Sequence, residues 1–286
     1  MKVIDLTHTI RADMPVYPGT EPPILAPANT YEQDGFKETR LTLFTHTGTH
    51  ADPPAHLFPG RTTLDQFPAE QFIGKALVID CRDLGPGEAI TLDRLGRYGG
   101  LAEQADFLLF HLGWDRFWGT NDYFGDYPCL DDEVLDAILR GHYKGIGFDV
   151  IGLDPIADEN LTRHKKLFRD TDILNLENLK NLDQCGEGLF WFSCFPLKRR
   201  TATAPRCGRW PGSNDGKNKA WPFGHALFVP NMFQSFSPPG SLSSSAMVRL
   251  NWMEKMVAVV HTARKSATGS ARNTAKTLSA KKWGRI

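Results

Sequence analysis

The chain has 286 residues, of which 41% are hydrophobic and 23% charged, and its 33 basic side chains balance 33 acidic ones. This length and composition are typical of a globular protein with one large domain, or a domain plus an appendage. They exclude a membrane-spanning protein, because no stretch approaches the roughly 20 apolar residues that such a helix needs. The polar start of the chain lacks the apolar core of a secretory signal, so we expect a cytoplasmic protein.

Short apolar runs between turn residues predict a series of β-strands. In chain order, these strands cover residues 2–9, 39–46, 75–81, 105–113, 144–152, 172–179 and 188–195. Several of the runs are nearly continuous in apolar residues, which is typical of a sheet covered on both faces. Prolines and a glycine between the first two strands predict a long ordered loop or an arm.

Helices are predicted between some of these strands. In residues 131–141, four apolar side chains form one face, an aspartate can cap the start and Gly141 can close the end. A second helix is expected over residues 157–168. The alternation of strands and helices predicts an α/β fold with a β-rich N-terminal part.

The composition changes near Lys198. Residues 199–286 hold 15 Lys and Arg but only two acidic residues, whereas residues 1–198 hold 18 basic and 31 acidic ones. We therefore expect a folded domain over 1–198 and a basic, poorly ordered tail over 199–286, in which only 246–263 has an amphipathic helical pattern. The tail is interpreted as a disordered appendage, as a binder of nucleic acid or another anionic surface, or as sequence appended by a change of reading frame. We favour the last interpretation and do not expect nucleic acid as a partner.

Three of the nine histidines fall within the eleven-residue run HTGTHADPPAH. In an extended chain its three histidines and its aspartate would all point to one side, because side chains alternate along a strand; these residues are His46, His50, Asp52 and His56. A straight strand would hold His46 and Asp52 about 20 Å apart, so a shared metal ion requires a bend, which Gly48 can supply with φ > 0. A helix would also align the first two histidines, but the Thr-Gly-Thr segment and the two prolines argue against it.

Two imidazoles and a carboxylate suit Zn²⁺ or Mn²⁺ and leave coordination positions open for water and substrate. A catalytic cation lowers the pKa of bound water, and His56 could accept the proton and pass it to a leaving nitrogen. The run therefore predicts a metal-dependent hydrolase. The alternative is a loop of structural histidines that form hydrogen bonds around buried turns.

His164 and Glu177 form a second candidate group, on the expected helix and on a later strand. Taken alone, such residues are more often solvated or locally hydrogen-bonded. Glu177 lies among leucines, however, and a carboxylate inside such a strand is costly unless something pairs with it. A metal ion would do so.

These motifs resemble those of the cyclase family, a group of metal-dependent hydrolases that includes kynurenine formamidase and isatin hydrolase. The similarity rests on HTGTHADPPAH, on IDLTHTI with MPVYPG, and on RHKKLF followed by LENLKNLD. It extends from about residue 2 to Lys198, and the eleven-residue run matches the family signature throughout.

The resemblance implies a swivelling β/β/α type of fold, one or two Zn²⁺ or Mn²⁺ ions per chain, and a homodimer or homotetramer whose N-terminal arm helps to line a neighbour's site. It carries over His46, His50 and Asp52 as ligands of one cation, Asp52, His164 and Glu177 as ligands of a second, and His56 as the catalytic base. Tyr17, Phe36 and Trp114 could shape the pocket, although packing is the more common role of such residues.

We therefore predict an arylformamidase-like amidohydrolase that cleaves a C–N bond in a small molecule. The expected substrate is an N-formyl aromatic amine, a cyclic imide or a similar amide, attacked by metal-activated water. The alternative is a catalytically inactive metal-binding or assembly protein of the same fold with a replaced C-terminus.

Overall fold

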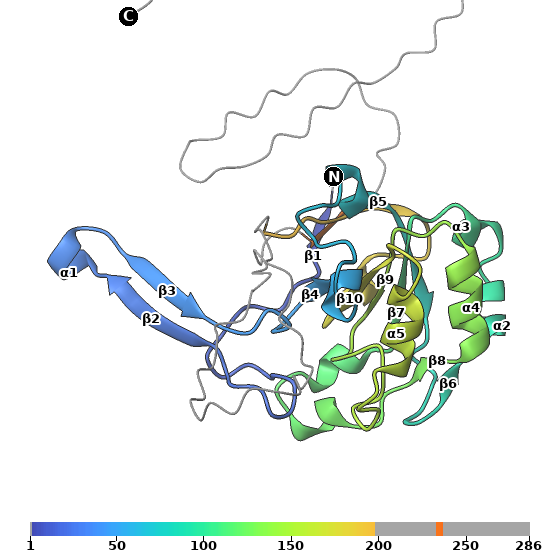
Figure 1. The fold of residues 1–286 in the computed structure, drawn as a ribbon, viewed down its shortest axis with the longest axis horizontal. Coiled ribbons are helices and arrows are strands. Elements are labelled where there is room, and N and C mark those ends of the chain that lie inside the picture. Colours follow the sequence, from blue (N-terminus) through green and yellow to red (C-terminus); the bar gives the residue numbers. More distant parts are fainter. Residues whose placement is uncertain (1, 198–232, 237–286) are drawn as a thin grey trace, which may run out of the picture. The chain divides into compact units, whose positions relative to one another are not determined.

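The structure, a computed structural model, describes residues 2–197 and the backbone of residues 233–236, all within the first of two compact units, Met1–Ser241. Among these residues the main sheet has eight strands, in the order β1-β12-β11-β5-β7-β9-β10-β4 (Figure 1). Their bounds are β1 Val3–Asp5, β4 His50–Asp52, β5 Ile73–Asp80, β7 Phe107–His111, β9 Gly145–Phe148, β10 Leu174–Glu177, β11 Phe190–Cys194 and β12 Phe233–Phe236.

The centre of the sheet is parallel. β5, β7, β9 and β10 run in one direction, and β4 and β11 join them antiparallel on either side. β7 and β9 are buried along their whole length. This burial on both faces explains why their sequences are mostly apolar.

Apolar cores lie on both faces of the sheet. Leu108 and Phe110 of β7 belong to one core, and Phe107 and Leu109 of the same strand belong to the other, as the alternation of side chains along a strand requires. The core that contains Leu108 also contains the buried face of α4 (Asp132–Arg140). This helix therefore covers the sheet over β7.

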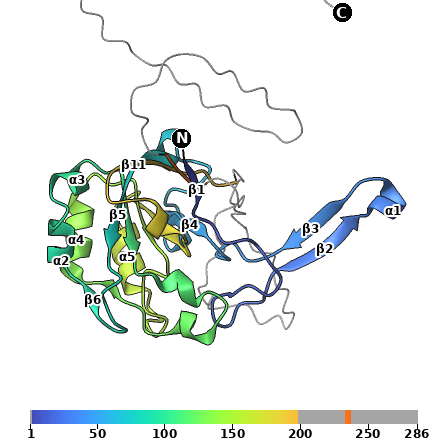
Figure 2. The same cartoon turned by 180° about the vertical axis from the view of Figure 1, so that it is seen from behind.

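The predicted helix at 131–141 is present as α4. Its N-cap, Asp131, accepts a hydrogen bond from the backbone N–H of Val134, and Gly141 follows its last residue. Two shorter helices, α2 (Leu92–Gly96) and α3 (Gly100–Glu103), lie beside α4 (Figures 1 and 2). Strands and helices together confirm the predicted α/β class.

The second predicted helix is shorter than expected. α5 covers Thr162–Phe168 rather than 157–168. The carboxylate of Asp158 accepts hydrogen bonds from the backbone N–H groups of Asn160 and Thr162. These contacts hold the preceding residues in a turn, so the helix starts later.

Residues 24–42 form a hairpin arm. β2 (Ile24–Asn29) pairs antiparallel with β3 (Glu38–Thr42), and α1 (Tyr31–Asp34) closes the turn. The arm points away from the main sheet in both views (Figures 1 and 2). Several of its large apolar side chains are exposed: Ile24, Leu25, Tyr31, Phe36 and Leu41. The predicted arm is thus built from strands, and the strand expected at 39–46 ends at Thr42.

Short elements connect the larger ones. β6 (Ala89–Ile90) pairs with β8 (Cys129–Leu130). Single 3₁₀ turns lie at η1 Pro54–His56, η2 Ala69–Phe72, η3 Trp114–Phe117, η4 Asn121–Phe124 and η5 Leu182–Gln184. Within the described part of the chain, no helix combines the length and apolar character needed to cross a membrane.

The expected tail, residues 199–286, contains β12, which pairs antiparallel with β1 and β11. The rest of this segment lies outside the described residues, including the helix predicted at 246–263. The division into a domain over 1–198 and a tail therefore stays a prediction.

Candidate metal centre

The pairing of β4 with β10 brings together two parts of the chain that lie more than 120 residues apart. Asp52 lies opposite Asn175, and His50 lies opposite Glu177. Alternate residues of a strand share one face, so these four side chains point to the same side at this edge of the sheet. All four are buried. The register of one strand pair thus collects imidazole, carboxylate and amide groups in one place.

Gly48 makes the bend that precedes β4. Its φ is 68°, and a Cβ at this position would lie 2.8 Å from Cε of Met14. His46 lies in the same turn, and its Nδ1 is 2.7 Å from Oδ1 of Asp52. Nε2 of His50 is 3.2 Å from the same oxygen. The turn therefore supplies a second imidazole that a straight strand would hold far away.

His164 and Glu177 extend this cluster. His164 lies on α5, with its Nε2 3.0 Å from Oε1 of Glu177 and 3.7 Å from Oδ2 of Asp52. The structure thus brings five of the predicted site residues into two groups that share one carboxylate. These groups are His46, His50 and Asp52, and Asp52, His164 and Glu177, with ligand atoms within 4.8 Å of one another in each group.

The donor atoms of this cluster fit a divalent cation. Nε2 of His50 and Oδ1 of Asp52 are buried and have no partner in hydrogen-bond geometry. A polar atom that lacks a well-aligned hydrogen bond in a protein interior is costly. Imidazole nitrogens and carboxylate oxygens are ligands that Zn²⁺ and Mn²⁺ both accept. A cation between the two atoms would satisfy both.

The electrostatics of the cluster favour positive charge. Burial opposes the charged form of His50, yet the carboxylate of Asp52 raises the pKa of this imidazole to about 9. Burial would likewise raise the pKa of Asp52, but His50 and then His46 hold it well below its usual range. A proton on His50 thus compensates the buried carboxylate of Asp52, and a divalent cation would take over this role.

Hydrogen bonds behind the ligands orient two of the imidazoles. Nδ1 of His50 lies 2.8 Å from the carbonyl oxygen of Gly48, and Nδ1 of His164 lies 2.7 Å from Oδ2 of Asp154. A proton on each Nδ1 would leave the lone pair of each Nε2 free to face the cluster. Such outer partners commonly fix the orientation and tautomer of metal-binding histidines.

Sequence reasoning missed Asn175. Its Nδ2 donates hydrogen bonds to Oδ2 of Asp52 and Oε1 of Glu177, at 3.2 Å and 2.8 Å. The amide thus holds the two carboxylates in place. The available signal was its position two residues before Glu177 in a predicted strand, which puts both side chains on one face.

Asn178 is a second residue that the sequence did not reveal. It has a φ of 57°, and its side chain is bonded at both ends. The Tyr123 hydroxyl donates to its Oδ1 at 2.7 Å, while its Nδ2 donates to the carbonyl oxygen of Gly48 at 3.0 Å. Asn178 therefore fixes the turn before β4 against the end of β10.

His56, the expected base, lies at the end of η1 beside the cluster. Its ring centroid is 4.0 Å from that of His46 and 6.1 Å from that of His164. Burial, and then the neighbouring His46, lower the pKa of His56 to about 3. The imidazole is therefore uncharged at neutral pH.

A pocket of about 470 Å³ opens over the cluster. Its lining combines ligand candidates with apolar and acidic side chains from the N-terminal segment and the loop before α5: Tyr17, Thr20, Phe44, Thr45, His46, Asp52, His56, Ile151, Gly152, Asp154, Glu159, Leu161, His164 and Glu177. Of the three aromatic residues considered from the sequence, only Tyr17 lies there. Phe36 is exposed near the tip of the arm, and Trp114 is buried in a core.

A third group of possible ligands has a different environment. His111, Asp115 and Asp149 offer atoms within 4.8 Å of one another. Both oxygens of Asp149 already accept backbone N–H groups, from Leu112 and Trp114. This carboxylate therefore has a structural role in the turn after β7.

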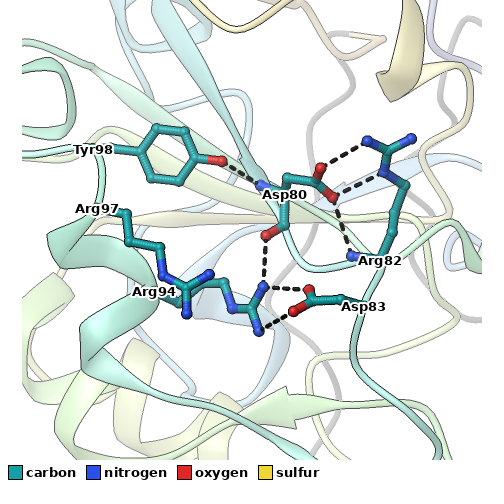
Figure 3. A pocket seen from close by; sticks show the side chains of 6 residues that line it. All are labelled: Asp80, Arg82, Asp83, Arg94, Arg97 and Tyr98. Atoms are coloured by element: carbon teal, nitrogen blue, oxygen red, sulfur yellow. Dashed lines mark hydrogen bonds and ion pairs between the residues drawn. The ribbon is translucent and has the colours of Figure 1, made fainter.

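Figure 3 shows a second pocket, of about 460 Å³, which is lined by arginines. Arg82 forms a two-pronged ion pair with Asp80, and Arg94 forms one with Asp83. The hydroxyl oxygen of Tyr98 accepts a hydrogen bond from the backbone N–H of Asp80 at 2.7 Å. The two guanidinium groups are thus already neutralised by neighbouring carboxylates.

An α/β fold with a cluster of potential metal ligands beneath a pocket is the arrangement expected of a metal-dependent hydrolase. Residues 4–155 match the model of the family described as "Putative cyclase". This match covers more than half of the chain, and the protein belongs to the cyclase family. The chain is 28% identical over 208 residues to kynurenine formamidase of Erythrobacter litoralis, with 72% of this chain and 91% of that protein covered. Kynurenine formamidase of Salinibacter ruber is 26% identical over 201 residues, with 69% and 91% covered.

Solved structures show the same fold. Isatin hydrolase A from Labrenzia aggregata superposes with a TM-score of 0.61 at 23% identity, over 71% of this chain and 90% of that one. A predicted metal-dependent hydrolase from Bacillus stearothermophilus gives a TM-score of 0.53 at 26% identity, over 69% and 91%. These comparisons confirm the prediction of a cyclase-family metal-dependent amidohydrolase.

Proposed function

We propose that this protein hydrolyses the C–N bond of an N-formyl aromatic amine, a cyclic imide or a similar amide, using Zn²⁺ or Mn²⁺. The observation that carries this proposal is the convergence of five potential ligands beneath a pocket, four of them buried and His46 partly exposed. Two of their ligand atoms are buried without a partner in hydrogen-bond geometry. The ligand roles proposed are those of His46, His50, Asp52, His164 and Glu177. The names of the relatives support the substrate class.

The reaction divides between the cation and the protein. A bound divalent cation supplies Lewis acidity towards a water molecule and the amide carbonyl. The water oxygen forms a bond to the carbonyl carbon, and the C–N bond breaks. His56 accepts the proton that the water loses and passes it to the leaving nitrogen.

The remaining residues hold this arrangement. Asn175 keeps the two carboxylates of Asp52 and Glu177 together through its amide. Tyr17 and Phe44 provide aromatic surface at the pocket, which suits a planar substrate ring.

Metal analysis combined with a substrate screen tests the proposal. Purified full-length protein should contain about one or two Zn or Mn per chain, and the loaded protein should cleave formanilides or cyclic imides. His56→Ala should keep the metal and lose activity, because the side chain lies beside the cluster but outside both ligand groups. His142→Ala, which changes a histidine outside the pocket, is the matched control. Full activity in metal-free protein would overturn the proposal.

The alternative, an inactive metal-binding or assembly protein, makes a different prediction. It requires stoichiometric metal without turnover of any formamide, imide or lactone in the same screen. Retention of metal with no activity in the unmodified chain would therefore favour it.

We also propose a homodimer or homotetramer and a cytoplasmic location. The exposed apolar side chains of the arm support self-association, since Tyr31 at its tip is 67% exposed. Light scattering after gel filtration should give a mass of two or four chains. Tyr31→Ser together with Phe36→Ser should lower the measured mass towards that of one chain. An unchanged mass would show that the arm does not hold the oligomer together.

A further inference from the structure

The pocket has a buried floor and an exposed mouth. The ligand candidates Asp52, His164 and Glu177 are each at most 5% exposed, so they form the floor. Tyr17 and Phe44 are 37% and 40% exposed. An amide placed at the floor would therefore direct the far end of its ring towards these aromatic side chains at the mouth.

Most acidic groups near the pocket are already compensated. Asp154 accepts hydrogen bonds from His164 and from the backbone N–H of Arg163, and it lies 3.8 Å from the guanidinium of Arg163. Asp52 and Glu177 face the cluster, where a cation would balance them. None of these three carboxylates leaves an uncompensated charge at the mouth.

Glu159 differs from these acids. It lines the pocket, its side chain is exposed, and it makes no hydrogen bond or ion pair with any described residue. The described lining contains no lysine or arginine that could balance it. Neighbouring Asp158, by contrast, is engaged by the N–H groups of Asn160 and Thr162. Glu159 is therefore the free negative charge of the described pocket mouth.

We propose that Glu159 determines substrate charge: the enzyme prefers aromatic amides whose ring carries a neutral or cationic group at the mouth, and it disfavours those with a carboxylate there. This inference rests on the proposed function. A carboxylate on the substrate would meet a like charge with no basic partner, whereas an ammonium group would gain an ion pair. At an exposed site, removing one charge should change the preference about threefold, and reversing it about tenfold.

The test uses three formanilides of similar size, with 4-methyl, 4-carboxylate and 4-aminomethyl substituents, and the metal-loaded full chain. We expect the ratio of kcat/KM for the cationic over the anionic substrate to fall about threefold in Glu159→Gln and about tenfold in Glu159→Lys. The kcat/KM of the neutral substrate should change less in these variants than that of either charged substrate. Ratios are compared between variants, so the intrinsic reactivities of the substrates cancel.

The matched control is Glu103→Lys, which makes the same charge change at an exposed position on α3, outside the pocket. A ratio that shifts equally in Glu103→Lys and Glu159→Lys would overturn the inference, since only long-range charge would then be measured. Rising salt should also reduce the preference of the unmodified chain.

A failure of the proposed function can be distinguished from a failure of the inference about Glu159. If no formanilide is cleaved, the same charge preference is measured as Kd values of 4-toluidine, 4-aminobenzoate and 4-aminobenzylamine. A cation preference that Glu159→Lys reverses would support the role of Glu159 without the reaction. Equal Kd values for the cationic and anionic ligands, in both the unmodified protein and Glu159→Lys, would refute this role.

Discussion

Replacing Asp154 by asparagine should weaken cation binding although Asp154 belongs to neither ligand group. The side chain accepts a 2.7 Å hydrogen bond from Nδ1 of His164, which directs Nε2 towards the cluster. An amide in its place could present N–H instead of an acceptor, and the imidazole would then carry its proton on Nε2. In that tautomer Nε2 cannot bind a metal.

The structure suggests the size of this effect. Asp154 is 3% exposed, so water cannot readily replace the lost acceptor. Loss of such an outer partner commonly lowers metal affinity about 10-fold to 100-fold, or about 1.4–2.8 kcal/mol. Asp154→Ala should lie at the upper end of this range, because it removes the acceptor altogether.

Competition with a chromogenic chelator measures the affinity for Zn²⁺ directly. Asp158→Asn is the control, because Asp158 accepts backbone N–H groups in the same loop but has no hydrogen bond to His164. Metal affinity unchanged in both Asp154 variants would refute the reasoning. An equal loss in the control would assign the effect to the loop rather than to the imidazole.

Three further predictions concern stability. Gly48→Ala should lower the free energy of unfolding, measured in urea, by about 1–2 kcal/mol, because φ there is 68°. Gly186→Ala is the comparison, since Gly186 also has a positive φ but lies away from the site. A loss of stability in Gly186→Ala but not in Gly48→Ala would contradict the reasoning. Burial, and then Lys180, lower the pKa of His8 to about 3, so between pH 3 and 6.5 the unfolded chain binds more protons than the folded one, and stability should fall as the pH drops below 6.5. His8→Phe, which can keep the stack on Trp118, should make the melting temperature depend less on pH. An unchanged pH dependence in this variant would show that His8 is not the group responsible. Chelation should lower the melting temperature, and re-added Zn²⁺ or Mn²⁺ should restore it; equal melting curves would indicate that no cation stabilises the fold.

The central sheet could be predicted from the sequence because its signal is local. The runs at 75–81 and 105–113 each contain four consecutive apolar residues, and they correspond to β5 and β7. β2 could not be predicted in the same way, because it contains Pro27 and is exposed along most of its length. Its pairing with β3 includes a register shift between Pro27 and Asn29. Strand formation there depends on a partner that propensity does not reveal.

In the candidate site, too, the residues that a local pattern reveals could be predicted, and those that depend on strand register could not. The residues between His46 and His56 are close in the chain, so their spacing alone suggested a shared centre. His164 and Glu177 were indicated mainly by family resemblance. Asn175 required the register of β10 against β4, which sets it opposite Asp52. No local pattern encodes this alignment.

The position of β4 has a consequence for the order in which the protein unfolds. This strand has three residues and lies at the end of the main sheet, where β10 is its one partner among the described strands. Asp52 and Asn175 are 123 positions apart, so bringing them together restricts a long stretch of polypeptide. A cation bound by residues of both strands would act as a reversible cross-link across that stretch. Its removal should let β4 detach first, and hydrogen exchange should then quicken at this edge while β7 stays protected.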